Sequence, residues 1–388
     1  MRKSVLLCGV AALWLNLADA KPLMLDTHLD TPVHFGREGW DFTKRHSFAD
    51  DFSQVDVPRM DEGGLDGGFF VIYTPSGPLN AKGYAAARDW ALMRAVHIRE
   101  QVAAHPDKLA LAFKAEDAGK IVAEGKKAIF QSMENSYPIG TDLSLLATFQ
   151  HLGVRMAGPA HFKTNQLADS ATDKPRWHGF SPLGKKWVAE MNRLGMLIDG
   201  SHSSDEVFDQ MLALSKTPII LSHSGCRAVY DHPRNLDDGR IAKLAAAGGV
   251  IQINSVYLMK RESSADMEAL EDRMEVIDQM SAADQARLNA EHKALMTEDH
   301  RPRANFDRFM ENILHAIKVA GVDHVGIGAD WDGGGGVVGM EDVADLGKVT
   351  AALKAAGYSD QDIEKIWSGN LLRVLKAAED YSRSAAMK

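Results

Sequence analysis

Short, dense runs of apolar residues recur along the chain and alternate with longer stretches that have the spacing of amphipathic helices. Each apolar run ends in polar residues or glycine, and such density is typical of strands covered on both faces. The predicted strands are Leu23–Leu29, Gly68–Tyr73, Lys127–Met133, Val154–Pro159, Met196–Gly200, Thr217–Ser222, Gly249–Asn254 and His324–Ala329. Helical patterns between them include Ala85–Ala103, Leu143–His151 and Leu183–Leu194. This alternation indicates a parallel sheet.

Repeated strand–helix units predict an α/β fold, a TIM-like (β/α)8 barrel of the metal-dependent hydrolase type, with a doubly wound open sheet as the alternative. Residues 259–305 break the rhythm, because they are charged and helix-prone. We interpret them as a helical insertion after the seventh strand, since spaced Leu, Met, Val and Ile residues favour a helix over a disordered loop. The length of 388 residues fits one such barrel, so we expect a single domain over residues 21–388.

The N-terminal segment has the pattern of a secretory signal peptide over residues 1–20. Arg2 and Lys3 precede the apolar run Val5–Ala18, and the small-x-small sequence at 18–20 is a cleavage signal. The run is shorter than the roughly 20 residues that a membrane-spanning helix needs. We therefore expect an exported protein, periplasmic or extracellular, without a transmembrane span. Cys8 lies inside the apolar run and carries little weight as a lipoprotein site.

Composition narrows the class of protein further. Lys and Arg number 44 and Asp and Glu 53, so the formal net charge is -9, which argues against a nucleic-acid partner. Two cysteines, of which only Cys226 remains after cleavage at Ala20, exclude a disulfide scaffold and a Cys-rich zinc module. The 15 histidines are more informative, because His is the commonest metal ligand.

Polar residues that suit metal binding follow or end several of the predicted strands. Taken singly, each is more often a hydrogen-bonded structural residue. In a barrel, however, the carboxyl ends of all strands meet at one rim. The residues on this rim are His28, Asp30, Glu134, His202, His223 and Asp330. Imidazole and carboxylate ligands without thiolate suit zinc or a related divalent ion, and their number suggests a two-metal site.

Seven segments extend this pattern over residues 23–376. They are Asp26–Asp30, Ser132–Asn135, His161–Ser170, Glu190–His202, Ser222–Ser224 with Arg234 and Asn235, Gly326–Gly333, and Gly369–Val374. Together they resemble the membrane (renal) dipeptidase family of zinc dipeptidases. The resemblance implies two Zn²⁺ ions at the mouth of the barrel. It places His28 and Asp30 on one ion, His202 and His223 on the other, and Glu134 as the bridge between them.

The same resemblance implies an exported dizinc dipeptidase and places three further residues in the active site. A metal-bridging hydroxide would attack the scissile carbonyl. Asp330 would act as general base and then acid, and His161 would stabilise the oxyanion. Arg234 would bind the terminal carboxylate of the dipeptide, with Arg227 as the alternative clamp. Tyr257 is a further candidate for contact with substrate, and a packed loop tyrosine is its competing interpretation.

The sequence departs from the mammalian pattern in its missing membrane-anchor signal, its missing cysteines and its long, charged insertion. Substrate range and assembly, including a homodimer, therefore stay open.

Two other functions compete with the dipeptidase: another metal-dependent amidase or lactonase on the same barrel, and a non-catalytic, metal-stabilised binding protein. Three other parts of the rim have open interpretations. Asp199 either orients a ligand histidine or has a structural role, and Asp332 either assists the site or begins a turn. We expect residues 333–336 to give the substrate room.

Overall fold

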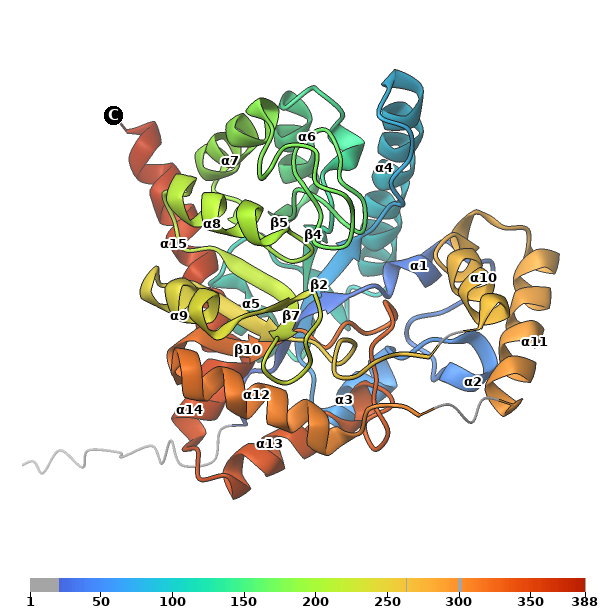
Figure 1. Cartoon of the computed structure of the whole chain (residues 1–388). Helices are drawn as coiled ribbons and strands as arrows, with labels where there is room; N and C mark the ends of the chain where they lie inside the picture. The colour runs from blue at the N-terminus through green and yellow to red at the C-terminus, as the bar shows by residue number, and fades with distance from the viewer. Residues whose placement is uncertain (1–20, 263, 299–301, 388) are drawn as a thin grey trace, which may run out of the picture.

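Parallel strands form the centre of the molecule, and helices surround them (Figure 1). The computed structural model describes residues 21–262, 264–298 and 302–387. The strands are β1 (Leu25–Leu29), β2 (Gly67–Ile72), β3 (Leu109–Leu111), β4 (Lys127–Met133), β5 (Val154–Ala157), β6 (Leu197–Ile198), β7 (Ile220–Cys226), β8 (Asn235–Leu236), β9 (Val250–Ile253) and β10 (Val325–Ile327).

Two sheets join to close a barrel. One has the order β1-β2-β4-β5-β6, with β3 beside β4, and the other has the order β10-β9-β7-β8. An isolated parallel bridge between Asp199 and Ile220 links β6 to β7, and a second between Leu29 and Trp331 links β1 to the residues after β10. The ring therefore runs β1-β2-β4-β5-β6-β7-β9-β10. The predicted (β/α)8 barrel is confirmed, and the alternative of an open sheet is wrong.

Each of the predicted strands overlaps a strand of the barrel, but their limits differ. The run Thr217–Ser222 was expected to end its strand at Ser222, whereas β7 begins at Ile220 and continues to Cys226. The polar residues of β7 are fully buried and hydrogen-bonded, so they do not end the strand. The expected strand Met196–Gly200 shortens to Leu197–Ile198. The two-residue and three-residue strands β8 and β3 are too short to leave an apolar run in the sequence.

Helices cover the outside of the sheets (Figure 1). They are α1 (Pro32–Phe35), α2 (Phe48–Asp51), α3 (Val57–Gly63), α4 (Ala81–Ala104), α5 (Asp117–Ala123), α6 (Ser144–Leu152), α7 (Pro182–Leu194), α8 (Asp205–Leu214), α9 (Asp238–Ala246), α10 (Ala265–Met274), α11 (Ala282–Glu298), α12 (Phe306–Ala320), α13 (Gly347–Ala355), α14 (Asp360–Glu364) and α15 (Asn370–Ala386). The predicted helices correspond to α4, α6 and α7. Asn80 and Ser181 cap α4 and α7 by accepting backbone N–H bonds.

The insertion is helical, as predicted, and consists of α10, a short 3-10 helix over Ile277–Gln279, and α11. It lies at the side of the barrel, next to α1 and α2 (Figure 1). A hydrophobic cluster separate from the barrel core joins these parts. Its buried members are Val33, Phe52, Met267, Leu270, Ile277 and Leu288. The insertion is therefore packed against the segment that directly follows β1.

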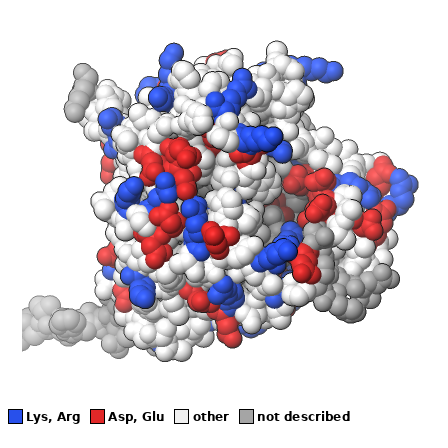
Figure 2. Space-filling view, viewed as in Figure 1, with Lys and Arg blue, Asp and Glu red and all other residues white. Residues whose placement is uncertain are grey.

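The expected signal peptide over residues 1–20 lies outside the described residues. Among the helices that are described, none combines the length and apolar character that crossing a bilayer requires. On the face seen in Figure 2, Lys and Arg side chains are interspersed with Asp and Glu. The described residues of that face form no continuous basic surface.

Candidate metal centre

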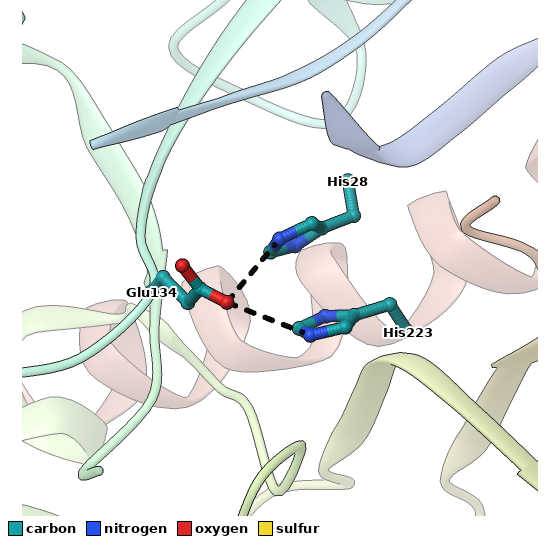
Figure 3. A group of neighbouring side chains, drawn as sticks. All are labelled: His28, Glu134 and His223. Carbon is teal, nitrogen blue, oxygen red and sulfur yellow. Dashed lines mark ion pairs between the residues drawn. The ribbon is translucent and has the colours of Figure 1, made fainter. Parts of the chain in front are cut away.

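One carboxylate oxygen lies at the centre of a cluster of imidazole rings. Oε1 of Glu134 lies 3.1 Å from Nε2 of His202 and 3.4 Å from Nε2 of His161. It lies 3.5 Å from Nε2 of His28 and 3.6 Å from Nε2 of His223. Figure 3 shows the carboxylate pointing toward the rings of His28 and His223. Four strand-end histidines thus converge on a single acidic side chain.

Two further carboxylates complete the cluster on the side of His28. Nε2 of His28 lies 3.3 Å from Oδ2 of Asp30 and 3.9 Å from Oδ1 of Asp330. All of these residues come from the carboxyl ends of strands: His28 lies in β1, Glu134 follows β4, and Asp330 follows β10. The structure therefore brings together the rim residues that the sequence singled out.

The backbone at two of these positions is strained. His202 has φ 64° and Asp330 has φ 70°, both in the left-handed region. A residue other than glycine is disfavoured there by about 1–2 kcal/mol. Such strain is typical of functional sites, where the surrounding structure holds it in place.

The charge state of the cluster suits a cation. Burial, together with the positive charge of Arg234, holds the pKa of His161, His202 and His223 well below the usual value, which leaves these rings in the neutral form that binds metals. Burial raises the pKa of Asp330 to about 8, and the neighbouring carboxylates of Asp30 and Glu134 add to this effect.

Histidine nitrogens without hydrogen-bond partners also support the interpretation that the cluster binds a cation. Neither ring nitrogen of His28 makes a hydrogen bond, and Nδ1 of His202 makes none, although both rings are buried. Buried polar atoms rarely lack a partner. Ligand atoms that lie close enough to share an ion form the sets His28–Glu134–His223, Glu134–His161–His202 and His28–Asp30–Asp330. Nitrogen and oxygen donors without sulfur fit zinc or a related divalent ion.

Hydrogen bonds behind the cluster orient its members. Asp199 accepts hydrogen bonds from the backbone and hydroxyl of Ser222, at 2.9 Å and 2.5 Å, and that hydroxyl lies 2.8 Å from Nδ1 of His223. Asp199 therefore acts on His223 through Ser222. Asp26 accepts from the backbone of His28 at 2.8 Å and of Ala329 at 3.0 Å, and so joins β1 to β10. The sequence reasoning had assigned no role to Asp26.

Arg234 is a buried cation at the edge of the cluster. Its guanidinium lies 5.1 Å from the centre of the Tyr257 ring, and Nη2 donates to the carbonyl of His223 at 3.2 Å. Its Nε has no partner. Arg227, the alternative clamp, instead pairs with Asp205 through both terminal nitrogens at 3.1 Å. Of the two arginines, Arg234 is therefore the one that has an N–H group without a hydrogen-bond partner.

A pocket of about 330 Å³ opens above the cluster. Six of the expected site residues line it, namely Asp30, Glu134, His161, His202, Tyr257 and Asp330. Residues 333–336 form part of the wall. A Cβ at Gly333 would overlap the carboxylate oxygens of both Asp30 and Asp330, so any other residue there would have to displace these two side chains.

Two pocket residues carry information that the sequence reasoning missed or left open. Tyr73, at the end of the second predicted strand, packs edge-on against His161 with ring centres 4.9 Å apart. Tyr73 lies at the carboxyl end of a predicted strand, as the site histidines were expected to do, so its position in the sequence also places it at the rim. Asp332 accepts hydrogen bonds from Thr31 at 2.7 Å and from the backbone of Gln54 at 2.5 Å. It ties the loop after β10 to the segment after β1.

Comparison with known proteins decides the family. A model of the membrane dipeptidase family, peptidase family M19, matches residues 16–388. The chain belongs to this family.

Several proteins named as dipeptidases are similar to nearly the whole chain. Dipeptidase tcpJ of Claviceps purpurea is 30% identical over 92% of this chain and 78% of its own length. The crystal structure of the probable dipeptidase PvdM from Pseudomonas aeruginosa is 32% identical, with a TM-score of 0.79 over 93% of this chain and 96% of that one. The M19 metallopeptidase described as dipeptidase AC is 26% identical, with a TM-score of 0.72 over 92% and 98%. The protein is accordingly an M19 metallopeptidase that hydrolyses dipeptides.

Proposed function

We propose that the M19 chemistry of this chain depends on two Zn²⁺ ions held by His28, Asp30, Glu134, His202 and His223. The observation that carries the proposal is the position of Glu134 Oε1, which lies between 3.1 and 3.6 Å from the Nε2 atoms of four histidines. His28 and Asp30 would hold one ion and His202 and His223 the other. Glu134 would contribute to both.

Bound zinc would supply an activated water at neutral pH and would polarise the scissile carbonyl. Asp330 lies on the pocket wall with its Oδ1 3.9 Å from Nε2 of His28, so it is placed to exchange a proton with the activated water and the leaving amine. His161, kept neutral by burial, would donate a hydrogen bond to the oxyanion.

Arg234 and Tyr257 would bind the carboxylate end of the dipeptide. Tyr257 lines the pocket, and the buried positive charge of Arg234 lies 5.1 Å from the centre of its ring, which favours a carboxylate at this place. A longer peptide would present an uncharged amide at that place, which explains a preference for dipeptides. Arg234→Met should therefore raise KM for L-Ala-L-Ala far more than it lowers metal content.

Metal analysis of two variants separates ligand from non-ligand histidines. His161 and His202 are almost equally close to Glu134, but only His202 is proposed as a ligand. We expect about two zinc equivalents in the wild type and in His161→Ala, and one or fewer in His202→Ala. His161→Ala should keep its metal yet lose about 10²–10³ in kcat. Loss of metal from His161→Ala would make it a ligand and would refute the assignment.

The location of the enzyme is a separate proposal. The sequence pattern of residues 1–20 supports export to the periplasm or the extracellular space, with a single barrel domain over 21–388. N-terminal sequencing of the protein made by its native host should begin at Lys21. A mature protein that retains Met1 or Arg2 would contradict export by this signal.

A further inference from the structure

The insertion forms one wall of the pocket that opens above the metal centre. Strand ends and their loops supply the side that carries the acids and histidines, and the insertion supplies the opposite set of lining residues. The lining residues that belong to the insertion are those at positions 259–262, 267, 271, 274, 275, 292, 296 and 302–304. Any substrate at the proposed zinc site therefore meets a surface that belongs to this insertion.

That surface is rich in methionine. Met259, Met267, Met274 and Met296 all line the pocket, and the insertion packs on Phe48 and Phe52, which line it as well. Methionine is flexible and polarisable, so it adapts to apolar groups of different shape and makes favourable contacts with aromatic rings. A wall of this composition is suited to contact with an apolar group.

Several polar residues of the wall contact other side chains of the protein. Glu275 accepts a hydrogen bond from the hydroxyl of Tyr73 at 2.8 Å, and Arg261 forms an ion pair with Glu271. His292 is buried, with its ring 5.0 Å from that of Phe48 and 5.2 Å from that of Phe52. Lys260, Glu262 and Arg303 also line the pocket, and the methionine and phenylalanine side chains supply the apolar part of the wall.

The wall is also held firmly in place. Arg94 of α4 donates to the carbonyls of Tyr73 at 2.8 Å and Glu275 at 2.7 Å, and its Nε pairs with Asp278 at 3.0 Å. The hydrophobic cluster around Phe52 and Leu288 fixes the other end of the insertion. A fixed wall favours selectivity, because no ordering of the protein has to accompany binding.

We propose that this wall, which we call the methionine wall (Met259, Met267, Met274 and Met296), is a side-chain subsite that selects dipeptides with one large apolar or aromatic side chain. The inference rests on the proposed dipeptidase site, because the dipeptide backbone must be held at the zinc ions for a side chain to reach the wall. The pocket volume of about 330 Å³ falls within the range of sites that enclose drug-sized ligands. It leaves space beyond the backbone of a dipeptide of small residues.

The test compares kcat/KM for L-Ala-L-Ala with that for L-Phe-L-Ala, L-Leu-L-Ala, L-Ala-L-Phe and L-Ala-L-Leu on the zinc-loaded enzyme. Each added methylene in a hydrophobic pocket changes discrimination by about 10- to 200-fold. We expect at least one bulky substrate to exceed L-Ala-L-Ala by tenfold or more. The position of the bulky residue in the better series assigns the wall to the N-terminal or C-terminal side chain.

Three matched variants locate the effect. Met274, Met280 and Met296 pack against the same hydrophobic cluster and are all partly buried, but Met280 does not line the pocket. Met274→Gln and Met296→Gln place an amide in the wall at nearly constant volume, whereas Met280→Gln makes the same change outside it. We expect the first two to lower the ratio of kcat/KM for the bulky substrate to kcat/KM for L-Ala-L-Ala by about tenfold. Met280→Gln should retain the preference.

The outcomes separate the inference from the proposed function. Hydrolysis of L-Ala-L-Ala without preference for any bulky substrate, or an equal loss of preference in all three variants, would overturn the methionine wall and leave the dipeptidase intact. No zinc-dependent hydrolysis of any dipeptide in the panel would instead overturn the proposed function. Circular dichroism and zinc content of each variant check that the fold and the metal site are retained.

Discussion

Arg94→Met should loosen the insertion from the barrel. Arg94 and Asp278 form an ion pair at 3.0 Å whose side chains are 1% and 2% exposed. Removing one member of a buried pair leaves the other charge uncompensated and typically costs about 3–5 kcal/mol. The substitution also removes donors from the carbonyls of Tyr73 and Glu275. Methionine is as good a helix former as arginine, so the propensity of α4 contributes little to the change.

Arg88 provides the matched control on the same helix. It pairs with Asp89, but their side chains are 38% and 72% exposed, so Arg88→Met should cost less than about 1 kcal/mol. Urea unfolding followed by tryptophan fluorescence measures the global loss, and limited trypsin digestion shows whether cleavage begins within residues 259–298. Asp278→Asn in the Arg94→Met background should recover part of the loss. An Arg94→Met protein that matches Arg88→Met in both assays would refute the buried-pair argument.

Three further predictions follow from single residues. Gly333→Ala should reduce zinc affinity or kcat/KM by about 10- to 100-fold, because its methyl group would displace two carboxylates; Gly347→Ala, where a Cβ meets nothing, is the control. Burial raises the pKa of Cys226 to about 12, so a thiol reagent at pH 8 should label it only after denaturation. Burial lowers the pKa of His292 from 6.5 to about 4. As pH falls, His292 therefore becomes protonated in the unfolded chain before it does so in the folded protein. Its contribution to the free energy of unfolding should be fully present above pH 6.5 and should fall by up to about 3 kcal/mol toward pH 4. His292→Gln should flatten that dependence in urea titrations at several pH values.

The sequence predicted the parts of the site that depend on position along a strand. His28, Glu134 and Asp330 could be selected because each lies at or just beyond the end of an apolar run, and the carboxyl ends of barrel strands meet. Tyr73 satisfies the same rule, but its phenol is not among the usual metal ligands, so a metal-site pattern does not select it. The fold class followed from the alternation of strands and helices, and only strand limits such as that of β7 needed correction.

Other features depend on contacts between distant segments and leave no local signal. The φ of 64° at His202 and the close approach of Gly333 to Asp30 and Asp330 arise from neighbours that only the folded barrel brings close. The apolar spacing in residues 259–305 predicted helices but not their partner. Val33 and Phe52, which receive the insertion, are more than two hundred residues away in the sequence. Its role as a wall of the pocket could therefore be seen only in the structure.

The two sheets of the barrel meet at two junctions, which we call seams, and an isolated bridge forms each of them. One lies between Asp199 and Ile220 and the other between Leu29 and Trp331, and each replaces a continuous ladder by a single bridge. The metal-site residues lie on both sides of these seams, since β1 and β4 belong to one sheet and β7 and β10 to the other. A cation held by residues of both sheets would cross-link them at the places where few backbone hydrogen bonds join them. The two junctions that close the barrel therefore also bring the metal-site residues together, and we expect an enzyme without metal to be least stable at its own active site.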